Sequence, residues 1–231
     1  MLRPQILVIA LALGLLDGAA AETKTSSPRP SNPSLAAIAD VPGLPRVLLL
    51  GDSISMGYTL PVREQLQGRA NVHRAPENCS STGHGLSRIE RWLGTGKWDV
   101  IHFNFGIHDA KLPPEGVRHA PPAIYEENLR RLVQRLRATG AKLIWATTTP
   151  IPLGGVLAPD RRFGDLAPHH AAARRVMEAN GVAINDLNAA VTPHLARYLK
   201  PGDLHYTTEG SQFLAGHVAR SIERLLPPRR E

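Results

Sequence analysis

The stretch "VLLLGDSISMG", residues 47–57, places a serine directly after a run of apolar residues. The apolar run has the length of a buried strand, and the glycine before Ser53 permits a tight turn into a helix. At such a turn, Ser53 would present its hydroxyl group at the edge of the sheet. Backbone N–H groups at the start of the helix could stabilise an oxyanion that develops beside it. The stretch therefore predicts a nucleophilic serine, although a serine that only caps the helix fits the same residues.

Strands and helices alternate along the rest of the chain. Apolar and β-branched runs predict strands at 46–50, 71–75, 98–106, 142–150 and 181–187. Amphipathic spacing predicts helices near 56–68, 85–94, 124–140, 168–180 and 208–226. With 231 residues, 42% of them hydrophobic, the chain can form one sizeable domain. We therefore expect a three-layer α/β/α domain around a central, mostly parallel five-stranded sheet.

Ligands of such sheets bind outside the carboxyl ends of the strands. The polar segments that follow the expected strands are 51–53, 78–80, 106–109 and the long loops 110–121 and 150–167. All of them are expected at one edge of the sheet, where the two long loops would build the specificity pocket. The basic loop residues suit an anionic substrate, although solvated loop charges are the simpler explanation; they are Lys111, Arg118, Arg161 and Arg162.

The motifs at these positions resemble those of the SGNH (GDSL-type) hydrolase family. "GDSI" (51–54) is similar to the family's first block with its nucleophilic serine, and "GIHD" (106–109) to its third block. "DLHYTTEG" (203–210) resembles the last block, which places the catalytic histidine at His205. The phrases "ENC", "KWDVIHFNFGIHD" and "HYTTEG" are similar to a bacterial branch of exported acylhydrolases. The resemblance spans about residues 46–226 and implies an SGNH hydrolase-like fold of flavodoxin-like topology.

Two departures from the family pattern concern the oxyanion hole. Ser80 stands where the family has a glycine whose backbone N–H donates, a role that serine keeps unless the backbone needs a positive φ. His108 stands where the family has an asparagine, and protonation of its ring would make activity depend on pH near neutrality. Asn104, on the same strand parity, is the alternative donor. The resemblance thus implies an oxyanion hole made by the Ser53 and Ser80 N–H groups and by His108 or Asn104.

A third departure concerns the acid that orients His205. Gly202 stands where the family has its aspartate. Side chains two positions apart share a face of an extended segment, so Asp203 is expected to reach the imidazole. Asp186 or a backbone carbonyl is the alternative.

The resemblance implies an exported serine esterase that needs no cofactor. Ser53 would attack an ester carbonyl, His205 would take the proton and return it to the leaving alcohol, and water would cleave the acyl-enzyme. The expected substrate is a small-molecule or glycan ester with a short acyl group, acetyl esters on carbohydrate being the first choice. The simultaneous changes at Ser80, His108 and Gly202 leave one alternative open, a catalytically decayed protein of this fold that binds carbohydrate or the cell envelope.

Other reactive side chains have structural explanations. Asp52 is expected to brace the turn, Asp109 to cap or hydrogen-bond its loop, and Cys79 to be a small buried hydrophobe. The three tryptophans are expected in the core; they are Trp92, Trp98 and Trp145. The pair His169–His170 has no set of neighbouring ligands that would specify a metal, so no metal site is expected.

The N-terminal region predicts export. Residues 1–21 combine Arg3, an apolar segment at 6–16 and a small-residue run that ends at Ala21, which is typical of a cleaved signal peptide. Residues 22–44 are rich in Ser and Pro and are expected to form a flexible linker to a catalytic domain at 45–231. The predicted location is the periplasm or the exterior, with no membrane span after cleavage.

The formal charge of +7 favours neither nucleic acid nor any other single partner. The arginines are scattered over several expected helices, where they would form solvated faces, so binding of nucleic acid is not expected. A basic protein whose surface charge retains it on anionic envelope polymers is a further alternative. The sequence does not specify the oligomeric state.

Overall fold

The computed structural model describes residues 32–112, 119–152, 156–158 and 161–228. The predicted signal peptide, residues 22–31 of the predicted linker and parts of both long loops lie outside these residues. No helix in the described part of the chain is both long enough and apolar enough to cross a bilayer.

The expected strands and helices all form, with ends that differ by a few residues. The central strands are β1 (Arg46–Leu50), β2 (Asn71–Arg74), β3 (Val100–Phe103), β5 (Lys142–Ala146) and β8 (Ala183–Asn185). The longer helices are α1 (Ser53–Gln65), α2 (Thr82–Leu93), α3 (Pro122–Arg137), α4 (Ala167–Ala179) and α7 (Thr208–Glu223). Two short helices, α5 (Leu187–Val191) and α6 (Leu195–Tyr198), follow β8, with the 3-10 turn Thr192–His194 between them.

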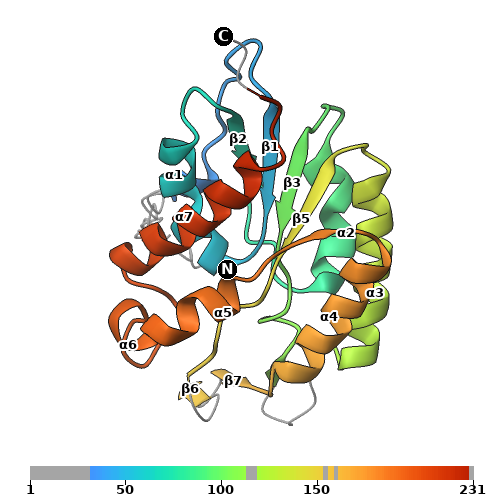
Figure 1. Ribbon diagram of the computed structural model, residues 1–231. Coiled ribbons are helices and arrows are strands. Elements are labelled where there is room, and N and C mark those ends of the chain that lie inside the picture. Colours follow the sequence, from blue (N-terminus) through green and yellow to red (C-terminus); the bar gives the residue numbers. More distant parts are fainter. Residues whose placement is uncertain (1–31, 113–118, 153–155, 159–160, 229–231) are drawn as a thin grey trace, which may run out of the picture. The chain divides into compact units, whose positions relative to one another are not determined.

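The five central strands form one sheet in the order β2-β1-β3-β5-β8, and every pairing is parallel. Helices α1 and α7 lie on one face of the sheet, and α2, α3 and α4 on the other (Figure 1). This confirms the predicted three-layer fold and its flavodoxin-like strand order. The order reverses at β1 and β3, so the crevice for a ligand opens between the carboxyl ends of these two strands.

Strand β1 shows how the sequence builds two cores at once. Successive side chains of a strand point to opposite faces of the sheet. Val47 and Leu49 accordingly pack into the apolar cluster that contains α1 and α7. Leu48 and Leu50 pack into the cluster that contains α2, α3 and α4. The continuous apolar run is therefore what a strand covered on both faces requires.

The structure describes residues 32–44 of the predicted flexible linker. These residues contact the domain: Asn71 bonds the backbone of Val41 at 2.8 and 3.0 Å, and Arg63 donates to the Ala36 carbonyl at 3.0 Å. His73 bonds Asp40 at 2.6 Å. Hydrogen bonds to the backbone fix a segment that has few apolar side chains, so the compact unit begins before the expected boundary at residue 45.

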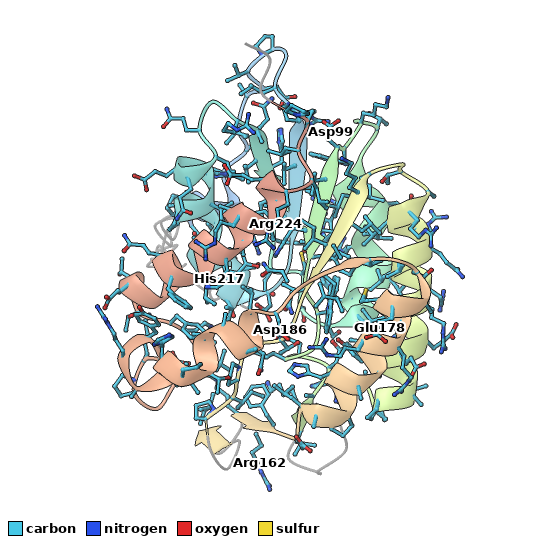
Figure 2. All side chains as sticks on the ribbon, viewed as in Figure 1. Asp99, Arg162, Glu178, Asp186, His217 and Arg224 are labelled. Carbon is cyan, nitrogen blue, oxygen red and sulfur yellow. The ribbon has the colours of Figure 1, made fainter. Side chains whose placement is uncertain are left out.

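The two long loops form a second, small sheet. Strands β4 (Lys111–Leu112), β7 (Arg161–Phe163) and β6 (Val156–Ala158) pair antiparallel in the order β4-β7-β6. The structure thus joins the loops that follow β3 and β5 at the carboxyl edge of the central sheet. Arg162 projects away from β7 into solvent, as Figure 2 shows, which fits a solvated loop charge.

Several of the scattered arginines on the helices have carboxylate partners. Surface ion pairs of this kind contribute little to stability. The pairs are Arg130–Glu126, Arg135–Glu90, Arg174–Asp186, Arg175–Glu126 and Arg197–Glu209.

Candidate active site

Three side chains, from the two ends of the domain sequence, form a line of hydrogen bonds. The Nε2 atom of His205 lies 2.8 Å from the Ser53 hydroxyl oxygen, and the Nδ1 atom lies 2.9 Å from Oδ1 of Asp203. All three side chains are partly exposed, so a substrate can reach them. In this arrangement the imidazole can take the serine proton while the carboxylate fixes its tautomer.

A tight turn places Asp203 where it can reach His205. In Lys200-Pro201-Gly202-Asp203 the Asp203 N–H donates to the Lys200 carbonyl at 3.1 Å, and Gly202 has a φ of +65°. Proline followed by glycine suits such a turn, because its third residue needs a positive φ. Glycine is therefore favoured at residue 202, and the acid takes the next position. The Pro-Gly pair was a signal for this displacement.

The charges around Asp203 keep it ionised. Partial burial pushes the pKa of this carboxyl upward, but hydrogen bonds from the His205 ring and the Leu204 N–H, together with the nearby charges, outweigh it and hold the pKa at about 2. One of those charges is Arg161 of β7, whose guanidinium lies 3.3 Å from Asp203 Oδ1. Asp203 is thus an acceptor for the His205 N–H at any pH at which the protein is expected to work.

Ser53 is the first residue of α1, three positions before the expected start of that helix. Asp52 caps the helix: its side chain accepts from the Ile54 N–H at 2.9 Å. The capping role that serine could have had therefore belongs to Asp52, and the Ser53 hydroxyl faces His205 instead. Asp52 is 2% exposed, in agreement with its expected bracing role.

The backbone at Ser80 has a positive φ, the conformation that serine adopts less readily than the glycine of the family pattern. Its φ is +53°, and it is the one non-glycine residue of the described chain in this region. Its N–H donates to the Asn78 side chain at 2.9 Å, and the preceding Cys79 N–H donates to the Gly51 carbonyl at 3.1 Å. The loop is thus tied to the turn that carries Ser53. A side chain in this conformation costs about 1–2 kcal/mol relative to the right-handed one.

His108 follows β3 at the same edge and makes no hydrogen bond through its ring within the described residues. Burial lowers the pKa of His108 below its ordinary value; the charge of Asp52 opposes this, and Lys111, His119 and His205 reinforce it. The ring is therefore neutral at pH 7 and has one N–H to donate. Any change in activity caused by protonation of His108 is therefore expected below neutral pH.

The two alternative residues have other hydrogen-bond partners in the structure. Asn104 is 8% exposed, and its amide nitrogen donates to the Ala146 carbonyl at 2.7 Å and to the Thr148 hydroxyl at 3.5 Å. In the free protein the Asn104 amide is thus engaged by Ala146 and Thr148, which favours His108 as the side-chain donor. Asp186 caps α5 and pairs with Arg174 at 2.6 Å, and its side chain makes no hydrogen bond to His205.

The remaining reactive groups have structural roles. Burial raises the pKa of Asp109 to about 6, and its carboxylate accepts from the N–H and hydroxyl of Thr82 at the start of α2. Burial raises the pKa of Cys79 to about 12, so its thiol is unreactive. All three tryptophans are buried. The Nε2 atoms of His169 and His170 donate to the backbone carbonyls of Ala120 and Thr148, and the described residues contain no cluster of three metal-ligating side chains.

Comparison with known proteins identifies the family. Residues 49–213 match the model of the GDSL-like lipase/acylhydrolase family. The chain belongs to this family. An arylesterase of Vibrio mimicus is 25% identical over 142 residues, which is 57% of this chain and 68% of that protein. The protein is therefore a carboxylic ester hydrolase of the GDSL type.

Solved structures of similar proteins share the fold of this GDSL-type hydrolase. A lipase/acylhydrolase from Enterococcus faecalis has a TM-score of 0.69 at 24% identity, covering 81% of this chain and all of that one. The acetyl xylan esterase AlAXEase has a TM-score of 0.65 at 18% identity, covering 77% of this chain and 99% of that one.

The sequence did not single out two residues that touch the site of this hydrolase. Arg161 was noted only as a loop charge, and its contact with Asp203 exists because the small sheet brings β7 to that side chain. Arg74 was part of a weak strand pattern, and it lies beneath the turn that carries Ser53. An arginine inside a strand of otherwise buried residues was the one available signal.

Replacing Ser80 with glycine tests whether the positive φ at this position destabilises the folded protein. Ser80→Gly should raise the free energy of unfolding by about 0.5 kcal/mol, because relief of the φ strain exceeds the added entropy of the unfolded chain. The backbone N–H is unchanged, so kcat should stay within about twofold. Urea unfolding and ester hydrolysis measure the two effects.

Ser80→Ala is the matched control, because it keeps the strain and removes only the hydroxyl, which has no hydrogen-bond partner among the described residues. Its stability should equal that of the wild type. A Ser80→Gly protein that is less stable than Ser80→Ala would show that the strain argument is wrong.

Proposed function

We propose that this hydrolase is an exported serine esterase that cleaves short-chain carboxylic esters, with acetyl esters on carbohydrate as the first substrates to test. The observation that carries the proposal is the hydrogen-bonded line from Ser53 through His205 to Asp203. Ser53 is the nucleophile, His205 the general base and then the general acid, and Asp203 the group that orients His205.

The proposed reaction proceeds through an acyl-enzyme. The Ser53 oxygen attacks the ester carbonyl while its proton passes to His205 Nε2, and the bond to the alcohol breaks as that proton is returned to the leaving oxygen. Water then enters, loses a proton to His205 and releases the acid. The oxyanion of both steps is held by the backbone N–H groups of Ser53 and Ser80 and by the ring N–H of His108.

The Ser80 donor in this proposal requires a small exchange of partners. In the free protein its N–H already bonds the Asn78 side chain at 2.9 Å. A charged oxygen is a stronger acceptor than a side-chain amide, so the oxyanion would take over or share this N–H in the transition state. The Ser80 contribution is therefore made mainly to the transition state, which raises kcat rather than substrate binding.

One comparison supports a short acyl group. The fold is similar to that of a protein named as an acetyl xylan esterase, which supports an acetylated glycan as the substrate.

We also propose export, which rests on the composition of residues 1–21. When the full chain is produced in a bacterial host, the mature protein should begin at Glu22 and appear in the periplasm or medium. N-terminal sequencing of the purified protein checks this. A cytoplasmic protein that retains Met1 or Leu2 at its N-terminus would contradict it.

Hydrolysis of p-nitrophenyl esters from acetate to octanoate tests the nucleophile and the acyl length together. The wild type should turn over acetate and butyrate faster than octanoate, as the proposed preference for short acyl groups requires. Ser53→Ala should lower kcat on the order of 10³-fold or more, since the acyl-enzyme can no longer form. The assay uses residues 22–231 of both proteins.

Ser87→Ala is the control, because this exposed serine bonds only the His84 carbonyl. It should keep full activity. Turnover that survives in Ser53→Ala would remove the proposed mechanism. A lack of turnover by the wild type on every ester, acetylated xylan included, would favour the carbohydrate-binding alternative.

Replacement of His108 tests its role as an oxyanion donor. His108→Ala should lower kcat on the order of 10²-fold with little change in KM, since the lost hydrogen bond forms mainly in the transition state. His108→Asn should recover most of the loss, because an amide can donate from the same place. Steady-state kinetics with p-nitrophenyl acetate measures both.

The pH dependence gives a second check on His108. Because burial lowers its pKa, the ring stays neutral from pH 9 down to at least its ordinary value near 6.5. The ratio of wild-type to His108→Asn kcat should therefore be constant between pH 7 and 9 and change only at lower pH. Full activity in His108→Ala would exclude this donor.

A further inference from the structure

A buried arginine lies directly beneath the turn that carries the nucleophile. Arg74 is the last residue of β2 and is 8% exposed. Its Nη2 atom donates to the Gly51 carbonyl at 2.8 Å and to the Asp52 carbonyl at 3.2 Å. These are the two carbonyl groups that immediately precede Ser53.

The other arm of the same guanidinium holds the first turns of α1. Its Nη1 atom donates to the Ser55 hydroxyl at 2.6 Å and to the Thr59 hydroxyl at 3.3 Å. Gly51 leaves room for this arrangement, since a Cβ atom there would lie 2.7 Å from the Ser55 hydroxyl oxygen. One side chain thus fixes both the turn before Ser53 and the helix after it.

The protein does not need Arg74 to satisfy these polar groups. The Gly51 carbonyl also accepts from the Cys79 N–H at 3.1 Å, and the Asp52 carbonyl from the Met56 N–H at 3.1 Å. Both hydroxyls donate to backbone carbonyls, that of Ser55 to Asp52 and that of Thr59 to Ser55, each at 2.7 Å. An apolar side chain at position 74 would therefore leave every partner with a bond.

Burial of the Arg74 charge is costly and is not repaid by an ion pair. Within the described residues all four hydrogen bonds of the guanidinium go to neutral groups, and its Nε atom is buried without a partner. Burial lowers the pKa of Arg74 and outweighs the Asp52 charge, which favours the charged guanidinium. A buried charge with no direct ion pair destabilises the folded state by comparison with an apolar side chain of similar size. The cost indicates a role other than stability.

We propose that Arg74 is a positioning residue that strengthens the Ser53 oxyanion donor. The carbonyl of Asp52 and the N–H of Ser53 belong to one peptide group, so a positively charged donor on that carbonyl polarises the group and makes the N–H a better donor. The effect acts when negative charge develops on the substrate oxygen. The inference rests on the proposed esterase mechanism, in which this N–H holds the oxyanion.

The second carbonyl extends the same effect to the neighbouring loop. Gly51 accepts from both Arg74 and Cys79, and Cys79 is followed by Ser80, the other proposed backbone donor. Arg74 therefore fixes the point at which the nucleophile turn and the oxyanion loop meet. Both donors would shift if the guanidinium were lost.

Three replacements of Arg74 test this role through kcat and KM for p-nitrophenyl acetate. Arg74→Met removes the charge and all four bonds, Arg74→Gln removes the charge but keeps a donor, and Arg74→Lys keeps the charge. We expect kcat to fall on the order of 10-fold in the Met and Gln variants, a part of the loss that removal of one oxyanion donor causes. KM should change less than about threefold, and Arg74→Lys should recover part of kcat.

Arg63→Met is the matched control. Arg63 also bridges α1 to backbone carbonyls, those of Val72 and Ala36 at 3.0 Å each, but it does so at the other end of the helix. Its loss should lower the melting temperature and leave kcat unchanged. A purely structural role for Arg74 would instead make its variants resemble Arg63→Met.

The outcomes separate this inference from the esterase mechanism. A folded Arg74→Gln or Arg74→Met protein with kcat within twofold of the wild type overturns the inference, as does an Arg74→Lys protein no more active than Arg74→Met. If Arg74→Met does not fold, Arg74→Gln decides, because it can still donate to a carbonyl. Activity that persists in Ser53→Ala would reject the mechanism itself, whatever the Arg74 variants do.

Discussion

The contact between His205 and Ser53 is the constraint on which the rest of the domain depends. The two residues are 152 positions apart, yet their side chains must meet at 2.8 Å. This requires α1 and α7, which begin at or just after the two residues, to pack on the same face of the sheet (Figure 1). The apolar cluster that contains Tyr58, Val62, Leu214 and Val218 supplies this packing. A rigid core of this kind holds catalytic groups more precisely than loops alone can.

Charged groups buried around the nucleophile turn serve geometry rather than stability. Asp52 caps α1, Asp109 caps the start of α2, and Arg74 holds the carbonyls before Ser53. Each loses hydration on burial, and burial raises the pKa of Asp109 to about 6. An apolar core of the same volume would be more stable, but it could not fix the backbone N–H groups in one direction. The site therefore resembles other catalytic centres in giving up some stability for preorganisation.

Local pattern was sufficient to predict the order of the elements and the edge at which the site lies. The apolar run of β1 and the amphipathic spacing of α3 are signals that need no distant contact, because they reflect how a strand or helix meets a core. Local pattern is less informative where long-range contacts compete with composition. The Ser- and Pro-rich residues 32–44 pack against the domain through Asn71 and Arg63. Asn104 shares the strand parity of a donor but bonds β5 instead.

The sequence by itself determined the fold class, the family and the positions of Ser53 and His205, since these depend on motifs at strand ends and on alternating strands and helices. Only the tertiary structure decided which acid meets His205, because the turn at Gly202 fixes where Asp203 points. It also decided that Ser80 has a positive φ and that Arg74 lies beneath the nucleophile turn. The sequence pattern left the acid open among Asp203, Asp186 and a backbone carbonyl, because a local pattern offers candidates without their distances. The place of Arg74 depends on segments 15 to 23 positions apart that only the fold brings together.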